Sequence, residues 1–327
     1  MIESLKFMLI AIIPVIVGLI FTISSPLQVL SIWSSMIIVI AILITLLAYF
    51  LGFRSTLILR HSIGVIGFPQ SGKTTIITAV FNELFKNRFS RYKFVLRGNT
   101  IDRVNEDISK LEVGGKLSPT TDQDLFAYRV DVNIPFLFLS NKYKVEIGDC
   151  PGEDSLQFIE KHGEWLHHTP FFKWVLEADV FIFIIDLSLH FSDIDYHAKI
   201  VKAIRTAWQY IHEYHIEGKK NIKKKPILFV FSKADLLVRF HFEESLQKNP
   251  EDIKTIGFGD RFPNKVEYRK EMIDSFEQDI CQKYNDIISY LEKETRYFSI
   301  HFASYFASDQ NGNKLGIDNI LKNILPR

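Results

Sequence analysis

The stretch GFPQSGKT, residues 67–74, decides the fold because of what lies on either side of it. Before it, SIGVIG (62–67) has the apolar, β-branched composition of a buried parallel strand. After it, TTIITAVFNELF (74–85) has apolar residues near helical spacing. A strand, a glycine-containing loop and a helix in this order are the structural context of a phosphate-binding loop. The sequence therefore predicts an α/β domain with a doubly wound, mostly parallel sheet.

The residues of this loop have distinct expected roles. Gly67 and Gly72 let the backbone curl so that its N–H groups face one centre, and the helix N-terminus adds partial positive charge. Lys73 is expected to reach the β- and γ-phosphates of a nucleotide and to act in catalysis, while the Thr74 hydroxyl would bind Mg²⁺. The predicted nucleotide-binding set of the loop is completed by three further residues: Gln70, Ser71 and Thr75.

Two segments after the loop supply candidates for the metal and the γ-phosphate. YKVEIGDCPG (143–152) predicts a strand that ends at Asp149, a candidate Mg²⁺ ligand, followed by Gly152, whose N–H could contact the γ-phosphate. SPTTDQD (118–124) contains a candidate switch threonine. We take Thr121 as the metal-binding and catalytic candidate. Thr120 is the alternative, and an ordinary turn explains this segment nearly as well.

The segment KKKPILFVFSKAD (223–235) predicts a strand followed by a base-binding motif. Ser232-Lys233-Ala234-Asp235 resembles the [NT]KxD motif of GTPases. The Asp235 carboxylate would accept from two N–H groups of guanine, a pair that adenine does not present, and Lys233 would lie along the base. Ser232 replaces the usual Asn or Thr, but its hydroxyl could still brace the phosphate-binding loop.

A final strand is expected to bring a backbone N–H to the guanine oxygen. YFSIHFASY (297–305) predicts that strand, and Ala303-Ser304 is the candidate contact. Ala307-Ser308 is the alternative, and the sequence does not choose between them.

Further elements follow from the same kind of apolar patterning. The predicted strands are 91–98, 125–135, 180–188 and 226–231, and the predicted helices are 100–113, 265–294 and 316–325. We assign residues 55–327 to one nucleotide-binding domain, with insertions near 88–118 and 238–264.

In this order, GFPQSGKT, PTT, DCPG and SKAD resemble the motif series of TRAFAC-class P-loop GTPases over about residues 60–327. Together with the apolar amino-terminal segment, the chain is similar to the cytoplasmic G domain of the type VI secretion membrane-complex protein. The β subunit of the signal recognition particle receptor is a looser analogue. The resemblance implies GTP or GDP and Mg²⁺ as cofactors, and a protein partner in a membrane-associated complex.

One residue departs from that motif series and bears on the rate of hydrolysis. Many GTPases of this class carry Gln directly after DxxG, whereas this chain carries Glu153. A carboxylate there could accept a proton from water but would repel the γ-phosphate. We therefore predict a conformational switch with slow GTP hydrolysis, on the order of 10⁻³ s⁻¹ or less without a partner. The alternatives are a non-hydrolysing nucleotide-sensing scaffold and an ATP-driven membrane enzyme.

The amino-terminal segment predicts a membrane anchor. From Phe7 to Phe53 the chain has no Asp, Glu, Lys or Arg, and SSPLQ separates two apolar stretches, 7–23 and 29–53. A spanning helix needs about 20 apolar residues, so residues 1–54 are predicted to form a two-helix transmembrane hairpin. Basic residues outside these stretches place both ends, and therefore the nucleotide-binding domain, in the cytoplasm.

Composition argues against one class of partner. The chain has 39 basic and 38 acidic residues, a formal net charge of +1. That balance provides no extended positive field for a nucleic acid, so we expect none to bind. The two cysteines, Cys150 and Cys281, lack metal-ligand spacing.

Overall fold

The computed structural model describes residues 58–86, 92–96, 99–113, 115, 117, 128–136, 139–149, 174–218, 221–236, 270–307 and 314–326, with five residues nearer the amino terminus. The chain forms two compact units. One comprises Met1–Leu59, Arg91–Lys93 and Val132–Lys144, and the other comprises Arg60–Ser90, Phe94–Asp131 and Val145–Arg327. The second unit holds all of the candidate site described below.

Seven strands form one sheet within the described residues. They are β1 (Ile58–Gly67), β2 (Lys93–Leu96), β3 (Tyr128–Phe136), β4 (Leu139–Asp149), β5 (Val180–Asp186), β6 (Ile227–Ser232) and β7 (Phe298–Ala303). Their order in the sheet is β2-β3-β4-β1-β5-β6-β7. β1, β5, β6 and β7 pair in parallel, with Gly67 opposite Ile184 and Ser232 opposite both Asp186 and Ala303. The carboxyl ends of these strands therefore meet at one edge.

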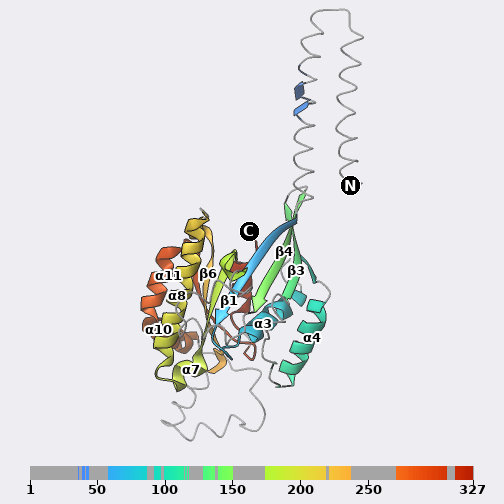
Figure 1. Cartoon of the computed structure of the whole chain (residues 1–327). Coiled ribbons are helices and arrows are strands. Elements are labelled where there is room, and N and C mark those ends of the chain that lie inside the picture. Colours follow the sequence, from blue (N-terminus) through green and yellow to red (C-terminus); the bar gives the residue numbers. More distant parts are fainter. Residues whose placement is uncertain are drawn as a thin grey trace, which may run out of the picture. The chain divides into compact units, whose positions relative to one another are not determined.

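The helices form two groups (Figure 1). α3 (Lys73–Phe85) packs against α4 (Asn99–Glu112) and α12 (Ile317–Ile324). The other group contains α7 (Leu187–Ser192), α8 (Tyr196–Glu217), α10 (Lys270–Lys283) and α11 (Asn285–Glu294). From β1 the chain passes to the β2–β4 side of the sheet, and it then returns to build β5, β6 and β7 on the other side. Ligands of open α/β sheets bind beside such a reversal, at the carboxyl ends of the strands.

The central strands are buried along their whole length, which explains their continuous apolar sequences. Alternate residues of β5 and β6 join one core with α8, α10 and α11. In that core the Phe181 ring lies edge-on to Trp208 with centroids 5.7 Å apart, and Phe231 stacks on Phe302 at 4.7 Å. Packed aromatic rings thus join β5 and β6 to the layer formed by α8, α10 and α11.

Two of the differences between the predicted and the observed elements have a physical cause that the structure shows. The predicted helix 265–294 is two helices, α10 and α11, because Tyr284 between them has φ −96° and ψ 11°. The Tyr284 side chain is fully buried and its ring lies 5.4 Å from that of Phe231, so core packing interrupts the helix. The predicted strand 180–188 ends at Asp186, whose carboxylate accepts from the N–H groups of Ser188 and Leu189 and caps α7.

The predicted hairpin at residues 1–54 lies outside the described residues, apart from five helical positions. All five have apolar side chains that are between 45% and 60% exposed: Met36, Val39, Ile40, Ile42 and Leu43. Among the residues that the structure describes, no helix has the length and apolar character needed to cross a membrane. Of the predicted insertions, 88–118 contains β2 and α4, and 238–264 lies outside the described residues.

Acid should destabilise the fold through a buried histidine of β7. His301 is 9% exposed, and burial lowers its pKa to about 4 from an ordinary value of 6.5. Between those values the unfolded chain binds more protons than the folded one, so the free energy of unfolding falls as pH falls through this window. We expect roughly 1 kcal/mol of loss from His301 at pH 5.5 relative to pH 7.5.

Urea unfolding of the full chain at the two pH values measures this loss. The His301→Asn variant, which cannot titrate there, should lose less stability on acidification. Burial also lowers the pKa values of His61 and His190, so some pH dependence should remain in the variant. An identical pH dependence in both proteins would contradict the assignment to His301.

Candidate nucleotide-binding site

The phosphate-binding loop joins the carboxyl end of β1 to the first turn of α3. A Cβ atom at Gly67 would lie 2.9 Å from both the carbonyl oxygen of Ile184 and the Ser71 hydroxyl, so only glycine fits there. Gly72, the N-cap of α3, has φ 83°, and Gln70 has φ 57°. These left-handed residues turn the chain sharply, which gives the loop the curled form that the glycine pattern predicts.

Lys73 places a positive charge at this loop. It is the first residue of α3, it is 6% exposed, and its Nζ donates to the carbonyl oxygens of Gly67 (2.8 Å) and Phe68 (2.7 Å). The first turn of α3 has no acidic residue. The ammonium and the helix N-terminus therefore add their positive potential at one point, which favours an anion.

The Ser71 hydroxyl also fits a phosphate ligand. It is buried, and it has no hydrogen-bond partner among the described residues. Buried polar atoms in proteins usually have a partner. A phosphate oxygen or a water molecule could supply one here.

Ser232 braces the loop against the base-binding motif. Its buried Oγ lies 2.6 Å from the carbonyl oxygen of Ser71 and 3.1 Å from that of Ile185. This is the contact that the sequence predicts for a hydroxyl in the place of Asn or Thr. It ties the end of β6 to the phosphate-binding loop across the end of β5.

The base motif meets the end of β7. Ser304 Oγ donates to Asp235 Oδ1 at 2.5 Å, and the N–H of Ala234 donates to the carbonyl oxygen of Ala303 at 3.2 Å. Ala303-Ser304, one of the two alternatives left open by the sequence, thus lies beside Asp235. Ser308 of the other pair lies outside the described residues. The Ser304 hydroxyl fixes the orientation of the carboxylate that would read the base.

Lys233 contacts a residue that the sequence-based reasoning missed. Its Nζ lies 2.6 Å from Asp186 Oδ2 and 3.0 Å from Ser188 Oγ. Asp186 ends β5, and the sequence pattern predicts it only as part of the strand 180–188. An acidic residue at the end of the otherwise apolar run VFIFIID was the available signal.

The switch and metal half of the predicted site is described only in part. Thr74 and Thr75 lie in the first turn of α3 and are partly buried. Asp149 ends β4, but its side chain lies outside the description, as do Thr120, Thr121, Gly152 and Glu153. The fit of Mg²⁺ therefore stays a prediction for this set of ligands.

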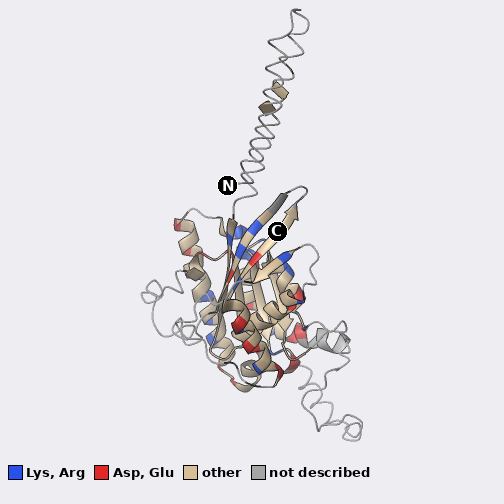
Figure 2. Ribbon diagram, turned by 90° about the vertical axis from the view of Figure 1, so that its right-hand side faces the viewer, with Lys and Arg blue, Asp and Glu red and all other residues tan. Residues whose placement is uncertain are grey.

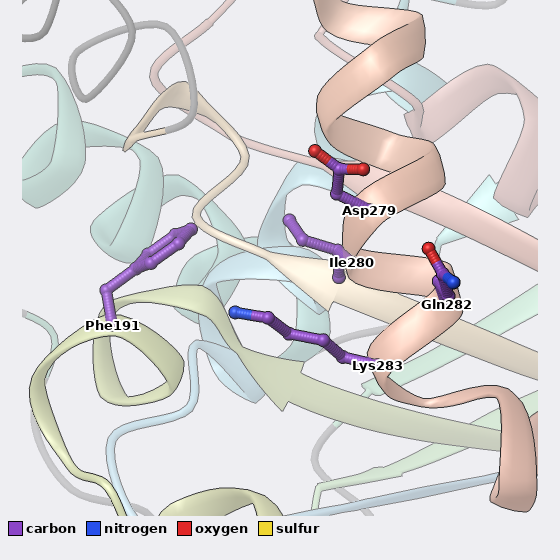
Figure 3. Close-up of a pocket in the computed structure, with 5 residues that line it drawn as sticks. All are labelled: Phe191, Asp279, Ile280, Gln282 and Lys283. Carbon is purple, nitrogen blue, oxygen red and sulfur yellow. The ribbon is translucent and has the colours of Figure 1, made fainter.

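Two surface features complete the picture of the second unit. Figure 2 shows basic and acidic residues interspersed along the described ribbon. A groove of about 520 Å³ lies beside α7 and α10. It is lined by Phe191, Asp279, Ile280, Gln282 and Lys283 (Figure 3). None of these lining residues belongs to the phosphate-binding loop or to the base motif.

Comparison with known proteins shows the family to which the chain belongs. No curated protein matches the chain. A solved structure, the Arl6 BBS3 small GTPase from Trypanosoma brucei with bound GppNp, is similar with 13% identity and a TM-score of 0.33, over 81% of this chain and 95% of that chain. The family model Double-GTPase 2 matches residues 61–293. This match supports the GTPase part of the resemblance and leaves the finer likeness to the secretion protein as a prediction. The chain belongs to the Double-GTPase 2 family.

Proposed function

We propose that the protein is a membrane-anchored guanine-nucleotide switch that binds GTP and GDP with Mg²⁺ and hydrolyses GTP slowly. One observation carries the proposal. Ser232 joins the base motif to the phosphate-binding loop, and Ser304 orients Asp235 of the same motif. Groups suited to a polyphosphate and groups suited to guanine are therefore tied together at one edge of the sheet.

The described residues divide the work of binding. Lys73 and the backbone N–H groups at the start of α3 would neutralise the phosphates. Asp235, held by Ser304, would accept the two N–H groups of guanine. Mg²⁺, when bound through Thr74, Asp149 and Thr121, would add charge stabilisation at the β- and γ-phosphates. The protein partner is proposed from the resemblance alone, since the switch needs a readout.

Base specificity tests the guanine assignment. Asp235→Asn replaces the charged acceptor with an amide, which should weaken GTP binding about 10- to 100-fold and favour xanthine nucleotides. Competition of GTP, XTP and ATP against a labelled GDP on the detergent-solubilised full chain measures the change. Unaltered GTP binding in the variant would contradict the role of Asp235 in reading the base. Tighter binding of ATP than of GTP by the wild type would favour the ATP-driven alternative.

Turnover separates a slow switch from a scaffold. Because Glu153 takes the place of the water-orienting Gln, we expect single-turnover hydrolysis on the order of 10⁻³ s⁻¹ or slower. Lys73→Ala removes the buried ammonium, so it should abolish nucleotide binding and serves as the control for contaminating activity. A wild-type rate faster by two decades would refute the slow switch. Binding without any hydrolysis would favour the non-hydrolysing scaffold.

Membrane attachment is proposed from the charge-free run Phe7–Phe53 and from its described helical residues, whose apolar side chains are exposed. Such side chains would be covered by lipid. We expect the full chain to stay in the membrane pellet after alkaline carbonate extraction. A chain lacking residues 1–54 should be released into the supernatant. Extraction of the full chain by carbonate would contradict the anchor.

A further inference from the structure

We propose that Asp186 is a positioning residue for guanine binding, because it holds Lys233 in the orientation in which its side chain lies along the base. The inference rests on the proposed function and adds a positioning residue to it. Asp186 belongs to none of the motifs by which the site is identified from sequence.

The Asp186 carboxylate is fixed on both of its oxygens. Oδ1 accepts from the N–H of Ser188 (2.8 Å), the Ser188 hydroxyl (2.5 Å) and the N–H of Leu189 (3.4 Å). Oδ2 faces Lys233 Nζ at 2.6 Å, and the Asp186 side chain is 1% exposed. A buried carboxylate is costly unless it is paired and hydrogen-bonded. The pair with Lys233 is therefore the arrangement that the fold favours.

The backbone at Asp186 is held as firmly as the side chain. Its N–H donates to the Tyr196 hydroxyl at 2.8 Å, and Tyr196 is itself buried in the aromatic core. In the parallel pairing of β5 with β6, Asp186 lies opposite Ser232, which directly precedes Lys233. The Asp186 carboxylate is thus held rigidly beside Lys233, the residue that follows its strand partner Ser232.

Lys233 has a conformation that such an anchor explains. Its φ is 58°, and within the described residues the only other non-glycine residue with positive φ is Gln70 of the phosphate-binding loop. Such conformations are uncommon outside glycine and persist where the surroundings impose them. The Lys233 side chain is 36% exposed while its ammonium is bound to Asp186 and Ser188. The methylene stem is therefore the part left available to a flat ligand.

The three parts of the base motif are then each held by a different strand end. Ser232 is tied to the phosphate-binding loop, Asp235 to Ser304 after β7, and Lys233 to Asp186 at the end of β5. Without Asp186 the lysine would regain its rotamer freedom, and part of the binding free energy would be lost in ordering it.

The test measures binding of fluorescent N-methylanthraniloyl-GDP with Mg²⁺ to the detergent-solubilised full chain. Asp186→Asn keeps the size of the side chain and an oxygen for the α7 cap, but it removes the charge. We expect about tenfold weaker binding. If Asp186 acts through Lys233, then Asp186→Asn should change affinity by less than about threefold in a Lys233→Met background. An equal loss in both backgrounds would indicate a merely structural role and overturn the proposal.

The chain offers a control Asp–Lys pair at the other end of the same two strands. Asp179, just before β5, pairs with Lys225, just before β6, with Nζ and Oδ1 3.5 Å apart. Asp179→Asn removes a longer and more exposed Lys–Asp pair without touching the nucleotide edge, so it should leave GDP affinity unchanged. An equal loss of affinity in Asp179→Asn and Asp186→Asn would also overturn the proposal.

Further measurements distinguish a failure of this inference from a folding defect and from a failure of the proposed function. If Asp186→Asn shows no thermal unfolding transition, Ser188→Ala decides, because its hydroxyl contacts both partners. We expect about threefold weaker binding, and unchanged binding would overturn the proposal. Wild-type binding with an intact response to Asp235→Asn, but with normal affinity in Asp186→Asn, would refute only this inference. Absence of guanine-nucleotide binding in the wild type would refute the proposed function as well.

Discussion

The hydrogen bond between Ser232 Oγ and the carbonyl oxygen of Ser71 is the constraint on which the site depends. β1 and β6 are not neighbours in the sheet, because β5 lies between them. A ligand with phosphates at one end and a base at the other needs a fixed distance between these two strand ends. The pairing of β1 and β6 with β5 places these ends, and Ser232 ties them together. Its second contact, with the carbonyl oxygen of Ile185, includes the intervening strand. The other contacts of the base motif refine an arrangement that this bond establishes.

The sequence predicts the architecture well where burial produces apolar runs and where function produces short polar motifs. The apolar runs of β5 and β6 are uninterrupted because both faces of the sheet are covered. Polar motifs follow those runs at once, and parallel strands bring such ends to one edge. The motif GFPQSGKT lies between an apolar strand pattern and a helical pattern, so the sequence predicts the loop and the helix after it together. The family match agrees with that prediction at the level of a GTPase.

What the sequence could not predict depends on register between distant segments. Asp235 and Ser304 are 69 residues apart, and Asp186 and Lys233 are 47 apart. Nothing local to Ala303-Ser304 distinguishes it from Ala307-Ser308. The pairing of Ser232 with Ala303 brings Ala303-Ser304 beside the base motif. The break at Tyr284 has the same origin, because helical periodicity continues through it and only the buried aromatic cluster requires the chain to bend there.

The buried ammonium of Lys73 has a consequence for how a ligand would be admitted. Two main-chain oxygens already satisfy that cation, and they hold the loop in its curved shape. When an anion binds, the Lys73 ammonium can replace a carbonyl acceptor with an oxygen of the anion. The loop need not rearrange first. Little ordering entropy should then oppose capture. Discrimination between nucleotides would then have to come from contacts with the base, at Asp235 and Ser304. A phosphate-binding loop of this kind binds the phosphates of any nucleotide, so the base motif must select the base.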